Sequence, residues 1–256
     1  MKVAKSLEAF EALRAGLSGT VGFVPTMGAL HEGHLSLMRI AQEQADHVVV
    51  SIYVNPTQFA PHEDFDAYPR DVEGDLKQLE GLADLVYLPS TKDIYPNGPA
   101  VTMNAGKAAE GLDSDFRPHF FHGVATVVHR LFEIVKPDTA VFGEKDFQQL
   151  MVIREMVEEY DLAIEIIGGP IARDEHGLAL SSRNAYLSED ELGIARMLNQ
   201  VLYNAAGDPS PEKLCEAEEM LLTAGFDKID YVEQRWGRIL AAAWLGKTRL
   251  IDNVEI

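Results

Sequence analysis

Apolar residues recur along the first two thirds of the chain in two alternating patterns. Between short continuous runs, apolar positions repeat at helical spacing, most clearly over 124–135. The short runs are typical of strands that are buried on both faces of a parallel sheet, and they cover 20–24, 47–54, 85–88, 139–142 and 164–167. This alternation predicts right-handed βαβ units around a parallel sheet.

The pattern changes near residue 170. Gly168-Gly169-Pro170 interrupts the alternation, and Ser188 with Glu191 predicts a capping box at the start of a helix. A further helix is expected to end at Gly225, and the apolar runs after it predict three strands. We therefore expect an α/β domain over residues 1–171 and a smaller α+β domain over residues 172–256.

Composition and charge exclude several classes of partner. The chain has 22 Lys and Arg against 41 Asp and Glu, a formal net charge of −19. Because such a charge repels nucleic acid and anionic membranes, we expect neither as a partner. The single Cys215 rules out an intrachain disulfide framework and fits a reducing compartment. With no apolar signal core at its start and no long apolar run, the chain is expected to be cytoplasmic.

The segment 21–35 combines the features of an anion-binding site. A buried strand leads into Gly28, and His31 and His34 follow where a helical pattern begins. Open α/β sheets bind phosphorylated ligands at such a junction of strand, loop and helix. Two histidines three residues apart can both face the anion. The alternative is a pair of helix-capping histidines, whereas zinc is disfavoured because no acidic or cysteine ligand accompanies them.

Two later segments offer further phosphate and ribose contacts. Gly143-Glu144-Lys145-Asp146 follows a buried strand with a glycine for close approach, a lysine for phosphate and an aspartate for ribose hydroxyls. Leu180-Ser181-Ser182-Arg183-Asn184 offers two hydroxyls and a guanidinium group. The alternatives are a charged turn and a loop that caps a helix. Gln58 and Gln149 follow strand ends and could bond a small hydroxy acid, but nothing in their spacing shows this, and a solvated glutamine is the default.

Taken in order and spacing, these segments resemble the pantoate–β-alanine ligase (pantothenate synthetase) family. The histidine motif alone would indicate only the wider HxGH nucleotidylyltransferase superfamily. The segments that carry the resemblance are 25–34, 54–59, 142–150, 180–184, 243–246 and 249–253.

The resemblance implies an activity and an architecture. The expected reaction is the ATP-dependent condensation of (R)-pantoate with β-alanine, which gives pantothenate, AMP and diphosphate through a pantoyl-adenylate intermediate, with Mg²⁺. The expected protein is a homodimer with a Rossmann-like N-terminal domain and a C-terminal lid domain. Its expected partners are ATP, pantoate and β-alanine.

The resemblance also assigns roles to residues at matching motif positions. His34 is the expected catalytic residue, as a proton donor. Gln58 is expected to contact pantoate and β-alanine, Gln149 to contact pantoate, and Asp75 and Gln78 to lie near the metal. The expected ATP contacts are Met27, Gly28, Ala29, Leu30, His31, Glu32, Gly33, His34, Gly143, Glu144, Lys145, Asp146, Ala172, Leu180, Ser181, Ser182 and Arg183.

The chain departs from the family pattern in two places. The usual Arg-Pro-Gly-His-Phe-x-Gly-Val is replaced by the segment 117–124, in which His119 replaces the glycine and Phe120 replaces the histidine. Gly74, beside Asp75, replaces an acidic residue. We therefore expect the β-alanine contacts of this loop, and the surroundings of the metal, to differ from the family pattern.

Three other functions share some of these motifs. Another adenylyl- or cytidylyltransferase would share the HxGH motif, but Gln58, Gln149 and the segment 180–184 indicate a small hydroxy acid. A tRNA-charging enzyme shares the histidines, but the net charge and the short chain argue against tRNA. A non-catalytic nucleotide-binding module would be expected to have lost one of its charged site residues, such as Lys145 or Arg183.

Overall fold

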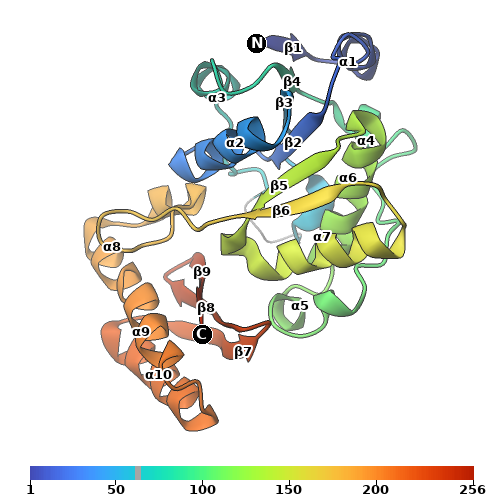
Figure 1. Cartoon of the computed structure of the whole chain (residues 1–256). Coiled ribbons are helices and arrows are strands. Elements are labelled where there is room, and N and C mark those ends of the chain that lie inside the picture. Colours follow the sequence, from blue (N-terminus) through green and yellow to red (C-terminus); the bar gives the residue numbers. More distant parts are fainter. Residues whose placement is uncertain (61–64) are drawn as a thin grey trace. The chain divides into compact units, whose positions relative to one another are not determined.

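The computed structural model describes residues 1–60 and 65–256, and the chain divides into two compact units (Figure 1). The first unit comprises Met1–Glu144 and Gln148–Gly169, and the second comprises Lys145–Phe147 and Pro170–Ile256. Each unit has its own sheet and its own apolar core. The domain boundary expected between residues 171 and 172 stays a prediction.

The first unit is built on the parallel sheet that the sequence predicts. Within the described residues its strand order is β1-β4-β3-β2-β5-β6, and all neighbouring strands run parallel. After β1, this is a Rossmann-like order that changes direction between β2 and β5. The sequence pattern missed β1 because it has only three residues and lies at the edge of the sheet. The strands are β1 (Lys2–Ala4), β2 (Val21–Thr26), β3 (His47–Ile52), β4 (Leu85–Tyr87), β5 (Thr139–Gly143) and β6 (Glu165–Gly169).

Helices and short 3-10 turns connect these strands. The segment 90–121 contains two four-residue helices and a 3-10 turn before α6 begins. The helix that begins at Val72 ends at Gln78. The α-helices are α1 (Leu7–Arg14), α2 (Glu32–Gln44), α3 (Val72–Gln78), α4 (Thr91–Ile94), α5 (Asp113–Phe116), α6 (Phe120–Val135) and α7 (Phe147–Glu159). The 3-10 turns are η1 (Pro56–Gln58), η2 (Lys107–Ala109) and η3 (Glu144–Asp146).

Both faces of the parallel sheet are covered by apolar side chains. Val24 and Val50 pack in one core cluster with Met38 of α2. On the opposite face, the ring of Phe23 lies edge-on to that of Phe132 of α6, with centroids 6.3 Å apart. Because neighbouring residues of a strand point to opposite faces, Val24 packs on the side of α2 and Phe23 packs on the side of α6. Burial on both faces explains why these strands are continuous apolar runs.

The second unit contains a helical segment and a three-stranded antiparallel sheet with the order β7-β8-β9. The capping box at Ser188 and Glu191 is confirmed, but the helix that it begins is divided at Arg196. The three predicted strands are also confirmed. The elements are η4 (Ser182–Tyr186), α8 (Glu189–Ala195), α9 (Met197–Ala206), α10 (Pro211–Ala224), β7 (Lys228–Arg235), β8 (Arg238–Leu245) and β9 (Thr248–Glu255).

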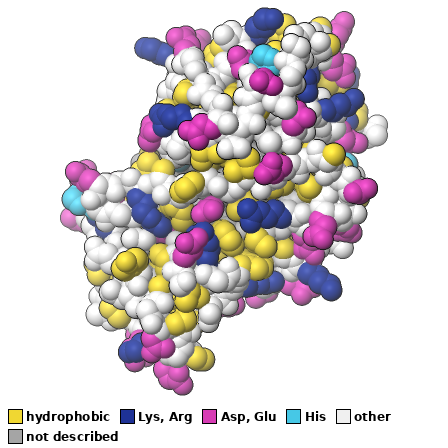
Figure 2. Space-filling model, in the orientation of Figure 1, with side chains coloured by type: hydrophobic (Ala, Val, Ile, Leu, Met, Phe, Trp, Pro, Cys, Tyr) yellow, Lys and Arg dark blue, Asp and Glu magenta, His cyan; other side chains and the backbone are white. Residues whose placement is uncertain are grey.

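The surface mixes charges of both signs. On the face in view in Figure 2, acidic side chains and the fewer basic ones are interspersed. Among the described residues, no helix combines the length and the apolar character that a membrane crossing requires.

Candidate functional site

The switch point of the parallel sheet carries the first two sequence motifs. β2 and β5 are neighbours, with Gly22 paired to Thr139 and Phe23 to Ala140. The loop from Met27 to His31 follows β2, and η3 follows β5. Ligands of open α/β sheets bind at the carboxyl ends of the strands that flank such a point. The loop after β2 and the end of β5 therefore lie where a nucleotide site is expected.

The turn after β2 is held by one buried carboxylate of α3. Oδ2 of Asp75 accepts a hydrogen bond from the backbone N–H of Ala29 at 3.0 Å, and Oδ1 accepts one from Leu30 at 2.7 Å. Gly28 has φ +85°, and a Cβ there would lie 2.8 Å from Oδ2 of Asp75. Gln78 donates from Nε2 to the Leu30 carbonyl at 3.3 Å. The turn thus needs glycine at position 28 and an acceptor at position 75.

These contacts bear on the metal role expected for Asp75 and Gln78. Asp75 is 2% exposed, and burial raises the pKa of its carboxyl, while the two backbone hydrogen bonds act in the opposite direction. Protein-bound Mg²⁺ takes accessible carboxylate oxygens together with phosphates and several waters. The Asp75 carboxylate does not fit that arrangement, because it is buried and both of its oxygens accept backbone hydrogen bonds. Gln78 uses only its NH₂ group at the turn, and its expected place near the metal stays a prediction. Within residues 1–60 and 65–256, no group of three or more His, Cys, Asp or Glu side chains could hold a metal ion.

His31 and His34 form a reciprocal cap at the start of α2. Nδ1 of His31 accepts a hydrogen bond from the backbone N–H of Gly33 at 3.2 Å, and Nδ1 of His34 accepts one from the backbone N–H of His31 at 3.3 Å. The ring centroids are 4.1 Å apart. The capping alternative is therefore correct as a description of the structure, and the cap itself uses Nδ1 of each ring, not Nε2.

The cap determines which nitrogen of each imidazole ring carries the proton. Because Nδ1 accepts a hydrogen bond in both His31 and His34, each neutral ring carries its proton on Nε2. The donor of each ring is therefore Nε2–H, at the start of a 13-residue helix whose N-terminus carries a partial positive charge. Two neutral donors beside a helix N-terminus are suited to phosphate oxygens.

Gln58 lies at the end of η1 and meets the turn after β2. Its Nε2 points to Sδ of Met27 at 3.3 Å, and its Oε1 accepts a hydrogen bond from Nδ2 of Asn55 at 2.9 Å. The structure therefore brings together Met27, expected at ATP, and Gln58, expected at pantoate. Asn55, which supports Gln58 here, is not among the site residues expected from the sequence.

The altered motif at 117–124, which includes the start of α6, also contacts Gln58. Arg117 donates from Nη2 to the Gln58 carbonyl at 3.3 Å, and its guanidinium lies 3.9 Å from the centroid of the Phe120 ring. Phe120, the substitute for the family histidine, therefore stacks on Arg117. His119 caps α6 without a side-chain hydrogen bond.

The neighbours Gln148 and Gln149 have different surroundings. Gln148 is buried, its Oε1 accepts from the Asp113 N–H, and its Nε2 donates to the carbonyls of Ala108 and Gly111. It therefore anchors the loop that carries η2 and α5. Gln149 is only half-buried, and its pantoate contact stays a prediction.

In the second unit, Ala172 and Leu180 lie opposite each other on a short hairpin. The Leu180 N–H donates to the Ala172 carbonyl at 2.9 Å. Oγ of Ser181 accepts from the Arg183 N–H at 3.3 Å at the start of η4, so the capping role named as an alternative for this segment is present. Nδ2 of Asn184 donates to the Ala179 carbonyl at 3.0 Å and closes the loop.

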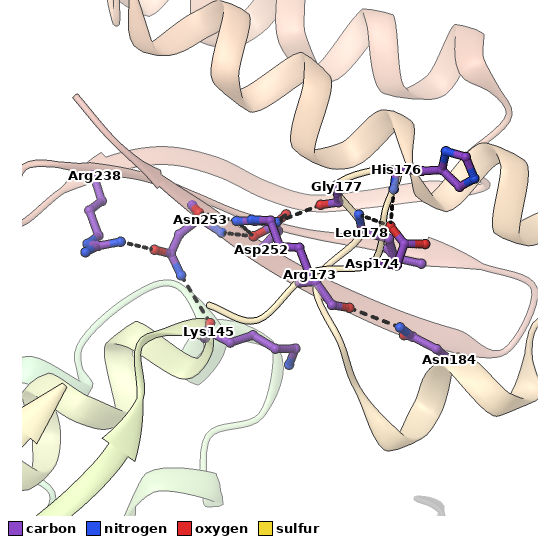
Figure 3. A network of polar contacts seen from close by, with 11 residues as sticks. Lys145, Arg173, Asp174, His176, Gly177, Leu178, Asn184, Arg238, Asp252 and Asn253 are labelled. Carbon is purple, nitrogen blue, oxygen red and sulfur yellow. Dashed lines mark hydrogen bonds and ion pairs between the residues drawn. The ribbon is translucent and has the colours of Figure 1, made fainter. Parts of the chain in front are cut away.

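A polar network fixes this hairpin to β9 (Figure 3). Arg173 forms two hydrogen bonds with the buried Asp252 carboxylate, at 2.7 and 2.9 Å. Next to it, Arg238 donates to Oδ1 of Asn253 at 2.9 Å, which turns Nδ2 of Asn253 toward the Lys145 carbonyl at 3.1 Å. The backbone of Lys145 is thus held by β9, which explains why Lys145–Phe147 belongs to the second unit.

Comparisons with known proteins agree on one family. The family model described as pantoate-beta-alanine ligase matches residues 1–255. Pantothenate synthetase from Mesorhizobium japonicum is 55% identical, with 96% of this chain and 95% of that protein aligned.

Solved structures give the same result. Pantothenate synthetase from Thermus thermophilus is 40% identical, with a TM-score of 0.90 over 100% of this chain and 99% of that one. Pantoate-beta-alanine ligase from Francisella tularensis, complexed with beta-gamma ATP and beta-alanine, is 38% identical, with a TM-score of 0.91 over 100% and 97% of the two chains.

Proposed function

The chain belongs to the pantoate-beta-alanine ligase family, and we propose that it condenses (R)-pantoate with β-alanine at the expense of ATP. The products are pantothenate, AMP and diphosphate. The observation that carries the proposal is the turn after β2, where Asp75 fixes the backbone and His31 and His34 present Nε2 donors at the start of α2.

In the first step, a pantoate carboxylate oxygen attacks the α-phosphorus of ATP. A P–O bond forms, the bond to the β-phosphate oxygen breaks, and diphosphate leaves. Negative charge increases on the leaving oxygen and on the oxygens around phosphorus. The Nε2–H groups of His31 and His34 are assigned to these oxygens, with His34 the leading catalytic residue. Fixed donors of this kind supply much of the catalysis in phosphoryl and nucleotidyl transfer.

In the second step, the β-alanine amine attacks the carbonyl carbon of pantoyl adenylate. The C–N bond forms, the C–O bond to the phosphate breaks, AMP leaves and the amine loses a proton. Gln58 is assigned to pantoate and to β-alanine, and Gln149 to pantoate. Arg117, stacked on Phe120 and bonded to the Gln58 carbonyl, supports this part of the site.

Other parts of the assignment stay predictions. They are the movement of the C-terminal unit as a lid, the homodimer, the cytoplasmic location and the remaining ATP contacts. These contacts are Met27, Gly28, Ala29, Leu30, Glu32, Gly33, Gly143, Glu144, Lys145, Asp146, Ala172, Leu180, Ser181, Ser182 and Arg183. Magnesium, when bound to ATP, neutralises phosphate charge. Neither the adenylation step nor the attack of the amine requires a protein ligand to the metal.

A ligation assay tests the proposal. The protein is incubated with ATP, Mg²⁺, D-pantoate and β-alanine, and AMP and pantothenate are quantified. We expect both products in equal amounts, and no AMP when pantoate is omitted. Release of AMP without pantoate, or no pantothenate, would contradict the proposed function.

A further inference from the structure

A buried hydrogen-bond network lies behind Gln58 in the first unit. Its centre is Asn55, which is 1% exposed and follows β3. Tyr95, the residue after α4, reaches it from 40 positions away and donates from its hydroxyl to Oδ1 of Asn55 at 2.7 Å. The Tyr95 hydroxyl also lies 3.0 Å from Oγ1 of Thr57. Burial raises the pKa of Tyr95 to about 12, so this hydroxyl keeps its proton at neutral pH.

The network fixes which way the Asn55 amide faces. Oδ1 of Asn55 accepts from the Thr57 N–H at 3.3 Å, from Oγ1 of Thr57 at 3.1 Å and from the Tyr95 hydroxyl. Nδ2 donates to the Gly123 carbonyl at 3.3 Å and to Oε1 of Gln58 at 2.9 Å. Reversing the amide would place its NH₂ group against the Thr57 N–H, which can only donate.

The fixed Asn55 amide in turn fixes Gln58. Because Oε1 of Gln58 accepts from Asn55, the NH₂ group of Gln58 is directed the other way, to Sδ of Met27. A thioether sulfur is a weak acceptor. A carboxylate or hydroxyl oxygen would be a much stronger one, so the arrangement presents a donor to an incoming hydroxy acid.

We propose that Tyr95 is a positioning residue for the hydroxy-acid substrate, acting through Asn55 to hold the Gln58 amide with its NH₂ group toward the substrate. The inference rests on the proposed function, because the substrate is pantoate. Tyr95 does not touch the substrate in this account. The backbone around the network allows little adjustment, since a Cβ on Gly123 would lie 2.4 Å from the Thr57 carbonyl oxygen.

The test compares Tyr95→Phe with Tyr53→Phe as a matched control. Both rings are buried, at 6% and 8% exposure, but the Tyr53 hydroxyl bonds to Oγ1 of Thr91 instead of Asn55. We expect Tyr95→Phe to raise the KM for pantoate about tenfold, the usual effect of losing one ordering hydrogen bond, with the KM for ATP within about twofold of wild type. Tyr53→Phe should leave both KM values near wild type.

A double-mutant cycle separates positioning from general stability. In the Gln58→Ala background, Tyr95→Phe should add little to the rise in the KM for pantoate, because the group that it positions is gone. Additive effects of the two substitutions, or equal changes in both KM values, would overturn the proposal.

A measurement without turnover keeps this inference separable from the proposed function. The side-chain NH₂ signals of Gln58, assigned by their loss in Gln58→Ala, are compared by NMR in wild type and Tyr95→Phe. We expect the signals to shift and their exchange with water to become faster. Unchanged signals would overturn the role of Tyr95 even if wild type ligates normally. Failure of wild type to ligate while the signals shift would contradict the proposed function alone.

Discussion

Replacing His34 with alanine is expected to lower kcat for ligation about 10²- to 10³-fold, the usual effect of removing one fixed donor from a transition-state oxyanion. The ring presents its Nε2–H to the phosphate oxygens because Nδ1 is occupied by the His31 backbone N–H. Steady-state kinetics on the purified variant measures the loss. His176→Ala, which removes an exposed histidine on the hairpin of the second unit, should retain the wild-type rate.

The variant His34→Gln separates catalysis from helix capping. Glutamine is a normal residue at this position of a capping box, so it can accept from the His31 N–H and preserve the start of α2. It has no second ring nitrogen to act as the donor. We therefore expect Tm to stay near wild type while kcat stays low. Recovery of the wild-type rate in His34→Gln would mean that capping is the whole role of His34.

Replacing Asp75 with alanine is expected to lower kcat/KM for ATP about 10- to 100-fold. The loss follows because the N–H groups of Ala29 and Leu30 lose their acceptor, so the turn before His31 is no longer fixed. Leaving one buried and one partly buried N–H group without partners costs about 2 kcal/mol, which corresponds to a fall in Tm of about 4–8 °C in a chain of this size. Kinetics and thermal unfolding are measured on the same preparation.

Glu73→Gln is the matched control, since it removes an exposed acidic side chain from the first turn of the same helix. Its Tm and kcat/KM should stay near wild type. Titration with Mg²⁺ distinguishes the turn from a metal role. The Asp75→Ala defect should persist at saturating Mg²⁺, whereas full recovery there would show that Asp75 binds the metal.

Much of the fold is predictable from the chain because buried parallel strands leave continuous apolar runs. β3 and β5 were found in this way, and Ser188 with Glu191 marked the start of α8. β1 was not predicted, because three residues at a sheet edge are too few to form a recognisable apolar pattern. The break at Arg196 was not predicted, because neither Gly nor Pro lies between the end of α8 at Ala195 and the start of α9 at Met197.

The sequence predicts the motif residues of the candidate site, but not the residues that hold them in place. His31 and His34 sit within one motif, so their spacing alone suggests a shared task. Tyr95 and Asn55 are 40 residues apart, and no local pattern records their contact. Likewise, the resemblance suggested a metal role for Asp75. Only the folded chain shows that its carboxylate accepts a hydrogen bond from the backbone of Leu30, 45 residues away in the sequence.

Transfer of an oxygen label distinguishes an acyl-adenylate intermediate from an acyl phosphate. The protein is incubated with ATP, Mg²⁺, β-alanine and D-pantoate carrying ¹⁸O in both carboxylate positions, and the products are analysed by mass spectrometry. If pantoyl adenylate is the intermediate, AMP carries one ¹⁸O atom and the amide carbonyl of pantothenate carries the other. Unlabelled AMP, or ADP with the label in inorganic phosphate, would contradict it.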